Sequence, residues 1–252
     1  MNILIATANW YPSGGDWTYV ESICKIYENN GHNIIPFAMS DDRNFKTKYE
    51  KYFINNINYN DLNKNKNIKS VIKVLSSSIY SCDAVNKINL LLEENRIDIA
   101  QLNNIHNVHT PAIIKPLKKN RIPIVWRVLD YKILCPNRTF LSNDKICEEC
   151  FKSNYYNCFL NKCKKNSYSA SFVTAIESYF NKIMPYYKDV DMYTFQSEFS
   201  RDLFVKYGFD IKKTKIIENP FDSENIYKSN SKIESLKYIN YFDLYKVTSG
   251  LY

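Results

Sequence analysis

The sequence contains no run that approaches the roughly 20 apolar residues of a membrane span. Its first residues, "MNILIATANWYPSGG", also lack the basic start and the long apolar core of a secretory signal peptide. We therefore expect a cytoplasmic protein, in which thiols stay reduced. Seven cysteines among 252 residues are then explained less readily by disulfides than by metal binding or by free thiols.

Three further signatures are missing. No internal repeat is evident, and the loop after the first apolar segment is not a G-x-G-x-x-G fingerprint. The net charge of +8, from 34 Lys and Arg against 26 Asp and Glu, favours anionic partners. The basic residues are nevertheless scattered and form neither a clustered basic face nor an aromatic-basic motif. We therefore expect no nucleic-acid partner.

What the sequence does contain is an alternation of short apolar segments with amphipathic ones. The apolar segments predict strands at 2–7, 32–39, 97–102, 122–130, 190–196 and 214–222. The amphipathic segments predict helices between them, including 84–95, 110–121, 169–183 and 198–208. The order predicts an α/β fold with a Rossmann-like, doubly wound parallel sheet.

Local signals set the expected helix ends. Asp16 is a suitable N-cap for the first helix and Gly31 a suitable end. Pro116 is expected to interrupt the helix at 110–121. Ser197 is expected to cap the helix at 198–208. The polar, Asn-rich stretch 41–81 is interpreted as a variable insertion.

Ligands of doubly wound sheets bind beyond the carboxyl ends of the strands, so residues just after strands are informative. Gly14 and Gly15 allow close approach to a phosphate or sugar, although a plain turn explains them equally. His106 and His109 follow a strand, where a local hydrogen-bonding role competes with a catalytic one. Asp130 is more informative, because a carboxylate directly after a buried strand needs a partner.

A series of segments resembles the N-terminal domain of family 4 glycosyltransferases, from Met1 to about Asp222. The segments are "YPSGGDWTYVESICKIYENNGHNI", "LNNIHNVHTPAIIKPLKKNRIPIVW", "LDYKILCPNRTFLSNDKICEECFKSNYYNCFLNKC", "VDMYTFQSEFSRDLFVKYGF" and "KIIENPFD". The resemblance implies the GT-B architecture, in which two Rossmann-like domains enclose the active site. The N-terminal domain mainly holds the acceptor and the C-terminal domain mainly holds the sugar nucleotide.

The resemblance also implies roles for individual residues. Asp130 matches the aspartate of a His-Asp pair whose histidine is replaced here by Leu129, and His106 matches a strand-end histidine; these two are the expected catalytic residues. The residues expected to bind substrate or donor phosphate are Gly14, Gly15, Ser197, Glu198, Arg201 and Asn219.

The domain expected at 1–222 therefore carries a Cys-rich insertion at 135–163. Residues 223–252 are expected to form a linker and a vestigial start of the donor-binding domain. Their segment "KYINYFDLYKVTSGLY" has Asp243, Leu244 and Ser249 where the family has glycine, arginine and lysine. We interpret the chain as a truncated gene product, or as a half-enzyme completed by another chain.

The activity implied is retaining transfer of a hexose from a nucleotide sugar to a saccharide or lipid-linked acceptor, in polysaccharide biosynthesis. No cofactor is needed for that chemistry. The expected partners are the two substrates, a donor domain in trans and the inner face of the membrane, contacted peripherally. The alternative is a noncatalytic remnant that binds saccharide without nucleotide.

Five cysteines follow the spacing C-x11-C-x2-C-x7-C-x4-C from Cys135 to Cys163. Four thiolates suit tetrahedral zinc, and the compact set is Cys147, Cys150, Cys158 and Cys163. Free thiols and disulfides are the alternatives. A closed four-thiolate site would be structural, because catalysis needs an open position. Its expected task is to pin a polar loop beside the acceptor cleft.

Overall fold

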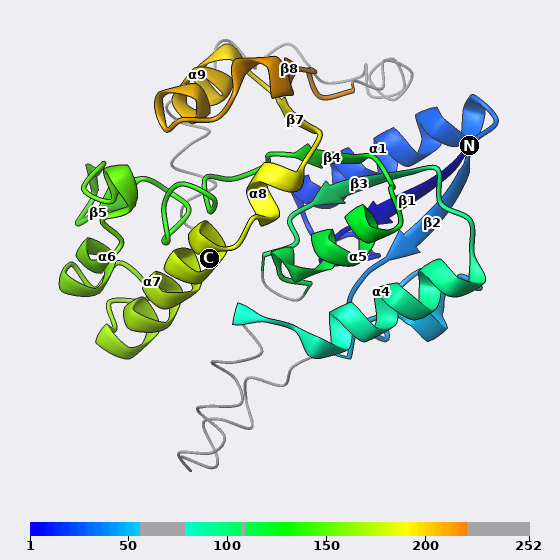
Figure 1. Ribbon diagram of the computed structural model, residues 1–252, viewed down its shortest axis with the longest axis horizontal. Coiled ribbons are helices and arrows are strands. Elements are labelled where there is room, and N and C mark those ends of the chain that lie inside the picture. Colours follow the sequence, from blue (N-terminus) through cyan, green and yellow to red (C-terminus); the bar gives the residue numbers. More distant parts are fainter. Residues whose placement is uncertain (56–78, 107–108, 221–252) are drawn as a thin grey trace, which may run out of the picture. The chain divides into compact units, whose positions relative to one another are not determined.

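The computed structural model describes residues 1–55, 79–106 and 109–220 (Figure 1). The chain divides into two compact units, Met1–Asn219 and Pro220–Tyr252. The linker and vestigial strand expected at 223–252 lie outside the described residues, and the domain boundary expected at 222 stays a prediction. All that follows concerns the first unit.

Six parallel strands form the sheet, in the order β2-β1-β3-β4-β7-β8. The strands are β1 (Asn2–Ala6), β2 (Asn33–Phe37), β3 (Ile99–Asn103), β4 (Ile124–Arg127), β7 (Met192–Phe195) and β8 (Thr214–Ile216). The predicted α/β fold with a doubly wound parallel sheet is confirmed. Each strand is shorter than its apolar segment, because pairing ends where the chain turns out of the sheet.

Helices cover both faces of the sheet (Figure 1). Ile3 and Ile5 of β1 pack against α1 (Gly15–Asn29), whereas Leu4 and Ala6 belong to the larger core on the opposite face. That second core also contains buried side chains of α4 (Cys82–Glu94), α5 (Ile114–Lys119), α8 (Tyr186–Asp189) and α9 (Glu198–Lys206). The alternation of side chains along a strand thus supplies two cores from one sheet.

Two expected helix signals are wrong. Gly14, not Asp16, is the N-cap of α1, and Asp16 lies in the first turn with its carboxylate directed elsewhere. Pro116 does not interrupt α5, because it lies in the first turn, where backbone N–H groups have no partner within the helix. Ser197 does cap α9, since its side chain accepts a hydrogen bond from the Ser200 N–H.

The segment between β4 and β7 contains elements that the sequence pattern did not indicate. They are a hairpin of β5 (Leu141–Ser142) and β6 (Lys145–Ile146), the 3-10 turn η3 (Phe151–Ser153) and the short α6 (Tyr156–Leu160). The long helix α7 (Tyr168–Ile183) follows. The other 3-10 turns are η1 (Glu50–Tyr52), η2 (Pro111–Ile113) and η4 (Ile211–Lys213).

The stretch expected to be an insertion, 41–81, is described only in part, since residues 56–78 lie outside the described residues. Its first part holds η1 and a single bridge between Met39 and Ile54. Among the described helices, none is long and apolar enough to cross a membrane.

Candidate functional site

The carboxyl ends of β1, β3 and β4 meet at one edge of the sheet. Because β2 and β3 lie on opposite sides of β1, the winding reverses between β1 and β3. Doubly wound proteins bind ligands in the crevice at this reversal. We call the residues around this reversal the edge site; they are Gly14, Gly15, Asp16, Asn104, His106, Arg127 and Asp130.

The two glycines lie between β1 and α1 and leave the start of the helix open. Gly14 has φ of 106°, a conformation that a side chain would strain. A Cβ added to Gly15 would meet no atom within 4 Å. Unpaired N–H groups at a helix start favour phosphate. The geometry suits the expected phosphate contact, which stays a prediction.

Asp16 and Asn104 connect the first helix to the end of β3. The Asn104 amide donates a hydrogen bond of 2.6 Å to the Asp16 carboxylate. Asn104 has φ of 40°, and its own amide oxygen is buried without a partner among the described residues. Buried polar atoms are rarely left unpaired, so this oxygen marks a place where a ligand or water would be held.

The two histidines after β3 have different surroundings. His106 is 3% exposed, its ring lies 5.1 Å from that of Trp126, and its Nδ1 has no partner among the described residues. Burial lowers the pKa of His106 well below its usual value, and the charges of Lys132 and Arg138 lower it further. His106 is therefore neutral at pH 7 and can accept or donate one hydrogen bond at Nδ1. His109 instead donates through Nε2 to the Phe37 carbonyl at 3.0 Å and belongs to the core.

A pocket of about 10 Å³ is lined by Asn104, by His106 and by Asp130, which lies in the loop that follows β4. The Asp130 carboxylate accepts from the Lys132 N–H at 2.9 Å and lies 3.5 Å from the Arg138 guanidinium. Burial raises the pKa of Asp130 above its usual value, although Arg138 and the Lys132 N–H oppose the rise. The loop thus holds a carboxyl group that retains its proton more readily than an exposed aspartate.

A buried ion pair anchors the Asp130 loop to α7. The Lys132 ammonium lies 2.9 Å from the Glu177 carboxylate, and the two side chains are 6% and 9% exposed. The same ammonium also donates to Thr174 Oγ1 at 2.5 Å and to the Pro136 carbonyl at 3.2 Å. These partners fix the loop that carries Asp130, and the sequence pattern gave no sign of them.

Arg127, the last residue of β4, is fully buried. Its guanidinium donates to the Ile217 carbonyl at 2.5 Å and to Asn219 Oδ1 at 2.6 Å, and it lies 4.6 Å from the Tyr19 ring centroid. All three partners are uncharged, so a buried positive charge is left without a counter-ion among them. Asn219, expected to bind substrate, is brought to the edge site by this arginine.

The residues at the start of α9 are brought to the Asp130 loop only in part. The Tyr131 hydroxyl lies 3.4 Å from Ser200 Oγ. Ser200 in turn donates its backbone N–H to Ser197, the N-cap of α9. Glu198 is exposed at the helix start. Arg201, expected to bind substrate or donor phosphate, pairs with Asp202 at 2.7 Å, and its binding role stays a prediction. Leu129, which replaces the family's histidine, packs beside the α1 core.

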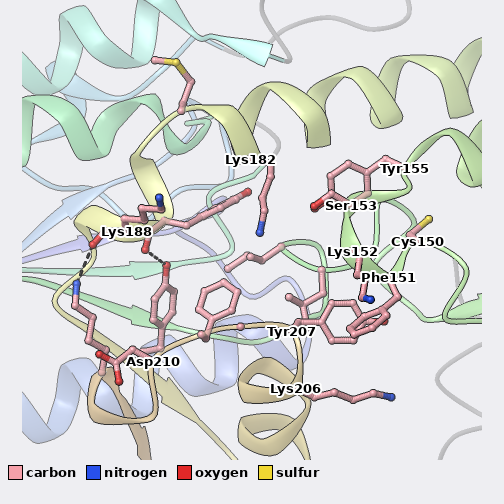
Figure 2. A pocket seen from close by; sticks show the side chains of 18 residues that line it. Cys150, Phe151, Lys152, Ser153, Tyr155, Lys182, Lys188, Lys206, Tyr207 and Asp210 are labelled. Atoms are coloured by element: carbon pink, nitrogen blue, oxygen red, sulfur yellow. Dashed lines mark hydrogen bonds between the residues drawn. The ribbon is translucent and has the colours of Figure 1, made fainter.

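A cavity of about 520 Å³ lies beside the Asp130 loop, between α7, α8, the segment that runs from the end of α9 into η4, and residues 150–155 (Figure 2). Aromatic and aliphatic side chains form much of its wall, and five lysines line it against a single acid, Asp210; the lysines are Lys152, Lys182, Lys188, Lys206 and Lys213. Figure 2 shows Lys182 extending from α7 into the opening. The size suits a small organic ligand, and the charge suits an anionic one.

Two of these lysines are already engaged. Lys206 pairs with Glu148, and Lys213 donates to the carbonyls of Lys188 and Val190. The hydroxyl of Tyr207, another wall residue, is buried and has no partner among the described residues. The remaining lysines still outnumber the single acid that lines the cavity, so it keeps an excess of positive charge. We call it the lysine cavity.

The cysteines expected to bind metal lie together, outside the edge site. Cys147, Cys150, Cys158 and Cys163 line one small pocket, and Cys135 lines it with them. All seven cysteines are free thiols. As the side chains stand in residues 1–55, 79–106 and 109–220, no three Cys, His, Asp or Glu form a metal-holding group. Zinc binding stays a prediction.

Several residues of the site carried no usable signal in the sequence. Asn104, Arg127, Lys132 and Glu177 belong to common residue types with no motif around them, and Glu177 lies 45 positions from its partner. Arg127 is a partial exception. Its position inside the apolar run "IVWRVL" was a hint, because an unpaired charge in a buried strand is costly.

No family model and no curated protein matches the chain. Among solved structures, HepE from Anabaena in complex with UDP is similar to it, with 15% identity over 90% of this chain and 46% of HepE, at a TM-score of 0.44. The apo form of the lipopolysaccharide outer core galactosyltransferase WaaB is 14% identical over 88% of this chain and 46% of its own, with a TM-score of 0.44.

A third similar structure is UDP-N-acetylglucosamine 2-epimerase from Rickettsia bellii, with 12% identity over 87% of this chain and 45% of its own, at a TM-score of 0.43. The chain spans less than half the length of each of these proteins. Likenesses as distant as these assign no function.

Proposed function

We propose that this chain is the acceptor-side half of a GT-B glycosyltransferase of family 4, which transfers a hexose from a nucleotide sugar with retention of configuration. The observation that carries the proposal is the edge site. A glycine-opened helix start, a neutral buried histidine and a half-buried carboxyl group converge where a doubly wound sheet binds its ligand. The resemblance in sequence points to the same residues.

In this proposal the edge site faces the donor. The backbone at Gly14 and Gly15 approaches the diphosphate, where fixed N–H groups stabilise the departing charge. His106 supplies one hydrogen bond from its unpaired Nδ1, and Asp130 is held in place by Lys132 and Arg138. The cations that complete the diphosphate site belong to the donor domain, in a longer chain or in a separate one.

The lysine cavity is proposed as the acceptor side. Its aromatic wall suits a sugar ring or an apolar chain, and its lysines suit a phosphate or carboxylate carried by the acceptor. A lipid-linked saccharide combines these features. Such an acceptor places the protein in the cytoplasm, at the inner face of the membrane, as a peripheral enzyme of polysaccharide assembly.

The first test is saturation-transfer NMR of the full chain with UDP-glucose and GDP-mannose. We expect weak binding that Gly14→Val abolishes, because its side chain strains the loop that meets the phosphates. Gly31→Ala is the matched control: Gly31 also has a positive φ, but it lies at the opposite end of α1, so binding should persist.

We also expect no product from the chain alone with any nucleotide sugar, and transfer once a donor domain is supplied. Turnover by the chain alone would contradict the half-enzyme proposal. Binding of a sugar phosphate without any binding of nucleotide sugar would favour the second candidate, a noncatalytic acceptor-binding protein. The lysine cavity is the observation that favours that candidate, because it is complete within this chain.

A further inference from the structure

Five cysteines from four separate segments converge on one pocket. Cys135 comes from the loop after β4, Cys147 and Cys150 follow the β5–β6 hairpin, Cys158 lies in α6, and Cys163 in the turn after it. The pocket has a volume of about 10 Å³, which is room for a single atom. Packing alone does not explain this clustering, because single cysteines are commonly buried without other cysteines beside them.

The backbone around these cysteines adopts conformations that are otherwise avoided. Of the twelve non-glycine residues with positive φ in the described part of the chain, nine lie between 138 and 166. They are Arg138, Phe140, Asn143, Asp144, Lys152, Ser153, Lys162, Lys165 and Asn166. Several of them closely follow Cys135, Cys150 and Cys163 in the chain. Strain of this kind persists only where the surroundings over-determine the backbone.

The thiols of the metal-free pocket favour their protonated form. Burial raises the pKa of Cys135, and it raises that of Cys150 to about 12, although nearby backbone groups oppose the rise. The convergence of the cysteines on one pocket, and not the acidity of their thiols, is therefore the observation that points to a metal.

The core that the segment adds around the cysteines is small. The buried apolar cluster around it consists of Cys150, Tyr155, Cys158 and Ala175, so two of its four members are themselves cysteines. The hairpin strands are two residues long and α6 is five. Segments with so small a core are commonly held together by disulfides or metal, and the cysteines here are reduced.

We propose that Cys135, Cys150, Cys158 and Cys163 bind one zinc ion as four thiolates, with Cys147 left outside the ligand set. The first three are at most 9% exposed, and Cys163 packs against the Cys150 and Cys158 cluster. Each thiol gives its proton to solvent as the metal binds. The sulfurs that now line the pocket turn inward to reach the metal, at about 2.3 Å each.

This ligand set gives the metal a definite task. Cys135 lies five residues after Asp130, in the loop that Lys132 anchors to α7. Cys150 lines both the metal pocket and the lysine cavity. The metal would therefore fix the Asp130 loop and the cavity wall to each other. The expected compact set, without Cys135, would leave that loop unconnected to the metal.

The test uses the full chain, produced in zinc-supplemented medium and purified without chelator. We expect mass spectrometry to find about one zinc per chain, and we expect cobalt, titrated into metal-free protein, to give thiolate-to-cobalt charge-transfer absorption. Cys135→Ser should lower the amount of bound zinc per chain at least tenfold. Cys147→Ser should keep it, as should the matched controls Cys24→Ser and Cys82→Ser, which lie outside the pocket.

Each result decides the proposal. Wild-type protein with neither bound zinc nor the cobalt band would overturn the site, and this measurement needs no variant that must fold. Zinc retained by Cys135→Ser but lost by Cys147→Ser would overturn the ligand set and return it to the four C-terminal cysteines. Bound iron with visible colour in place of zinc would overturn the assignment of zinc as the metal, since four thiolates also hold iron–sulfur clusters.

Discussion

The sheet and the Cys-rich segment that follows β4 are stabilised in different ways, although they belong to one compact unit. In β1, Leu4, Ile5 and Ala6 are fully buried between two helical layers, and the backbone is regular. Residues 138–166 hold most of the left-handed backbone of the described chain, and three of them form a small core with Ala175 of α7. Burial is enough to specify the first region, whereas the second needs specific cross-connections.

Lys132 and Glu177 form a buried ion pair that connects the loop before this segment to the helix after it. We expect Lys132→Met to lower the free energy of unfolding by about 3–5 kcal/mol, because it leaves the Glu177 carboxylate buried without its cation. Denaturation in urea measures the loss.

The double variant Lys132→Met/Glu177→Leu should recover most of that stability, since a well-packed apolar pair replaces the buried charges. Lys182→Met, on the same helix as Glu177 but exposed, is the control and should change stability little. A small effect of Lys132→Met would show that the Asp130 loop is anchored to α7 by something else.

The sheet region should respond to pH through His109. Burial lowers the pKa of His109 to about 4, against 6.5 for an exposed histidine. The unfolded chain therefore binds a proton below pH 6.5 that the folded chain refuses until about pH 4. Stability should fall as the pH falls through that range, by about 3 kcal/mol from this residue.

His109→Gln should remove that part of the pH dependence while its amide still donates to the Phe37 carbonyl. Urea denaturation at a series of pH values between 7 and 4 would measure it. A variant with the wild-type slope would assign the proton uptake to other groups.

The smallest effect compares the two regions directly through equivalent helix caps. Ser197 caps α9 beside the sheet, and Ser167 caps α7 after the Cys-rich segment, each accepting from the N–H three residues on. Either serine changed to alanine should cost about 1 kcal/mol. Equal losses would mean that both helices unfold with the whole unit. A loss for Ser197→Ala alone would mean that α7 unfolds separately.

Much of the fold follows from local pattern. The strands, α1, α4, α7 and α9 were predicted at nearly their observed positions, because apolar periodicity reports which faces are buried. The pattern failed at Asp16 and Pro116, where the exact register of the first helical turn decides which residue caps and which N–H is free. It also missed the β5–β6 hairpin, whose two-residue strands have no periodicity to read.

Apolar periodicity was therefore enough to predict the parallel sheet, and it indicated that Gly14, His106 and Asp130 follow strands at one edge. The folded chain was needed to show that Asn104 contacts Asp16, that Arg127 is buried against Asn219, and that Lys132 pairs with Glu177. The two kinds of feature differ in range. Burial patterns repeat every two or three to four residues and can be read locally, whereas a polar contact such as that of Arg127 with Asn219 joins residues 92 positions apart and depends on the whole fold.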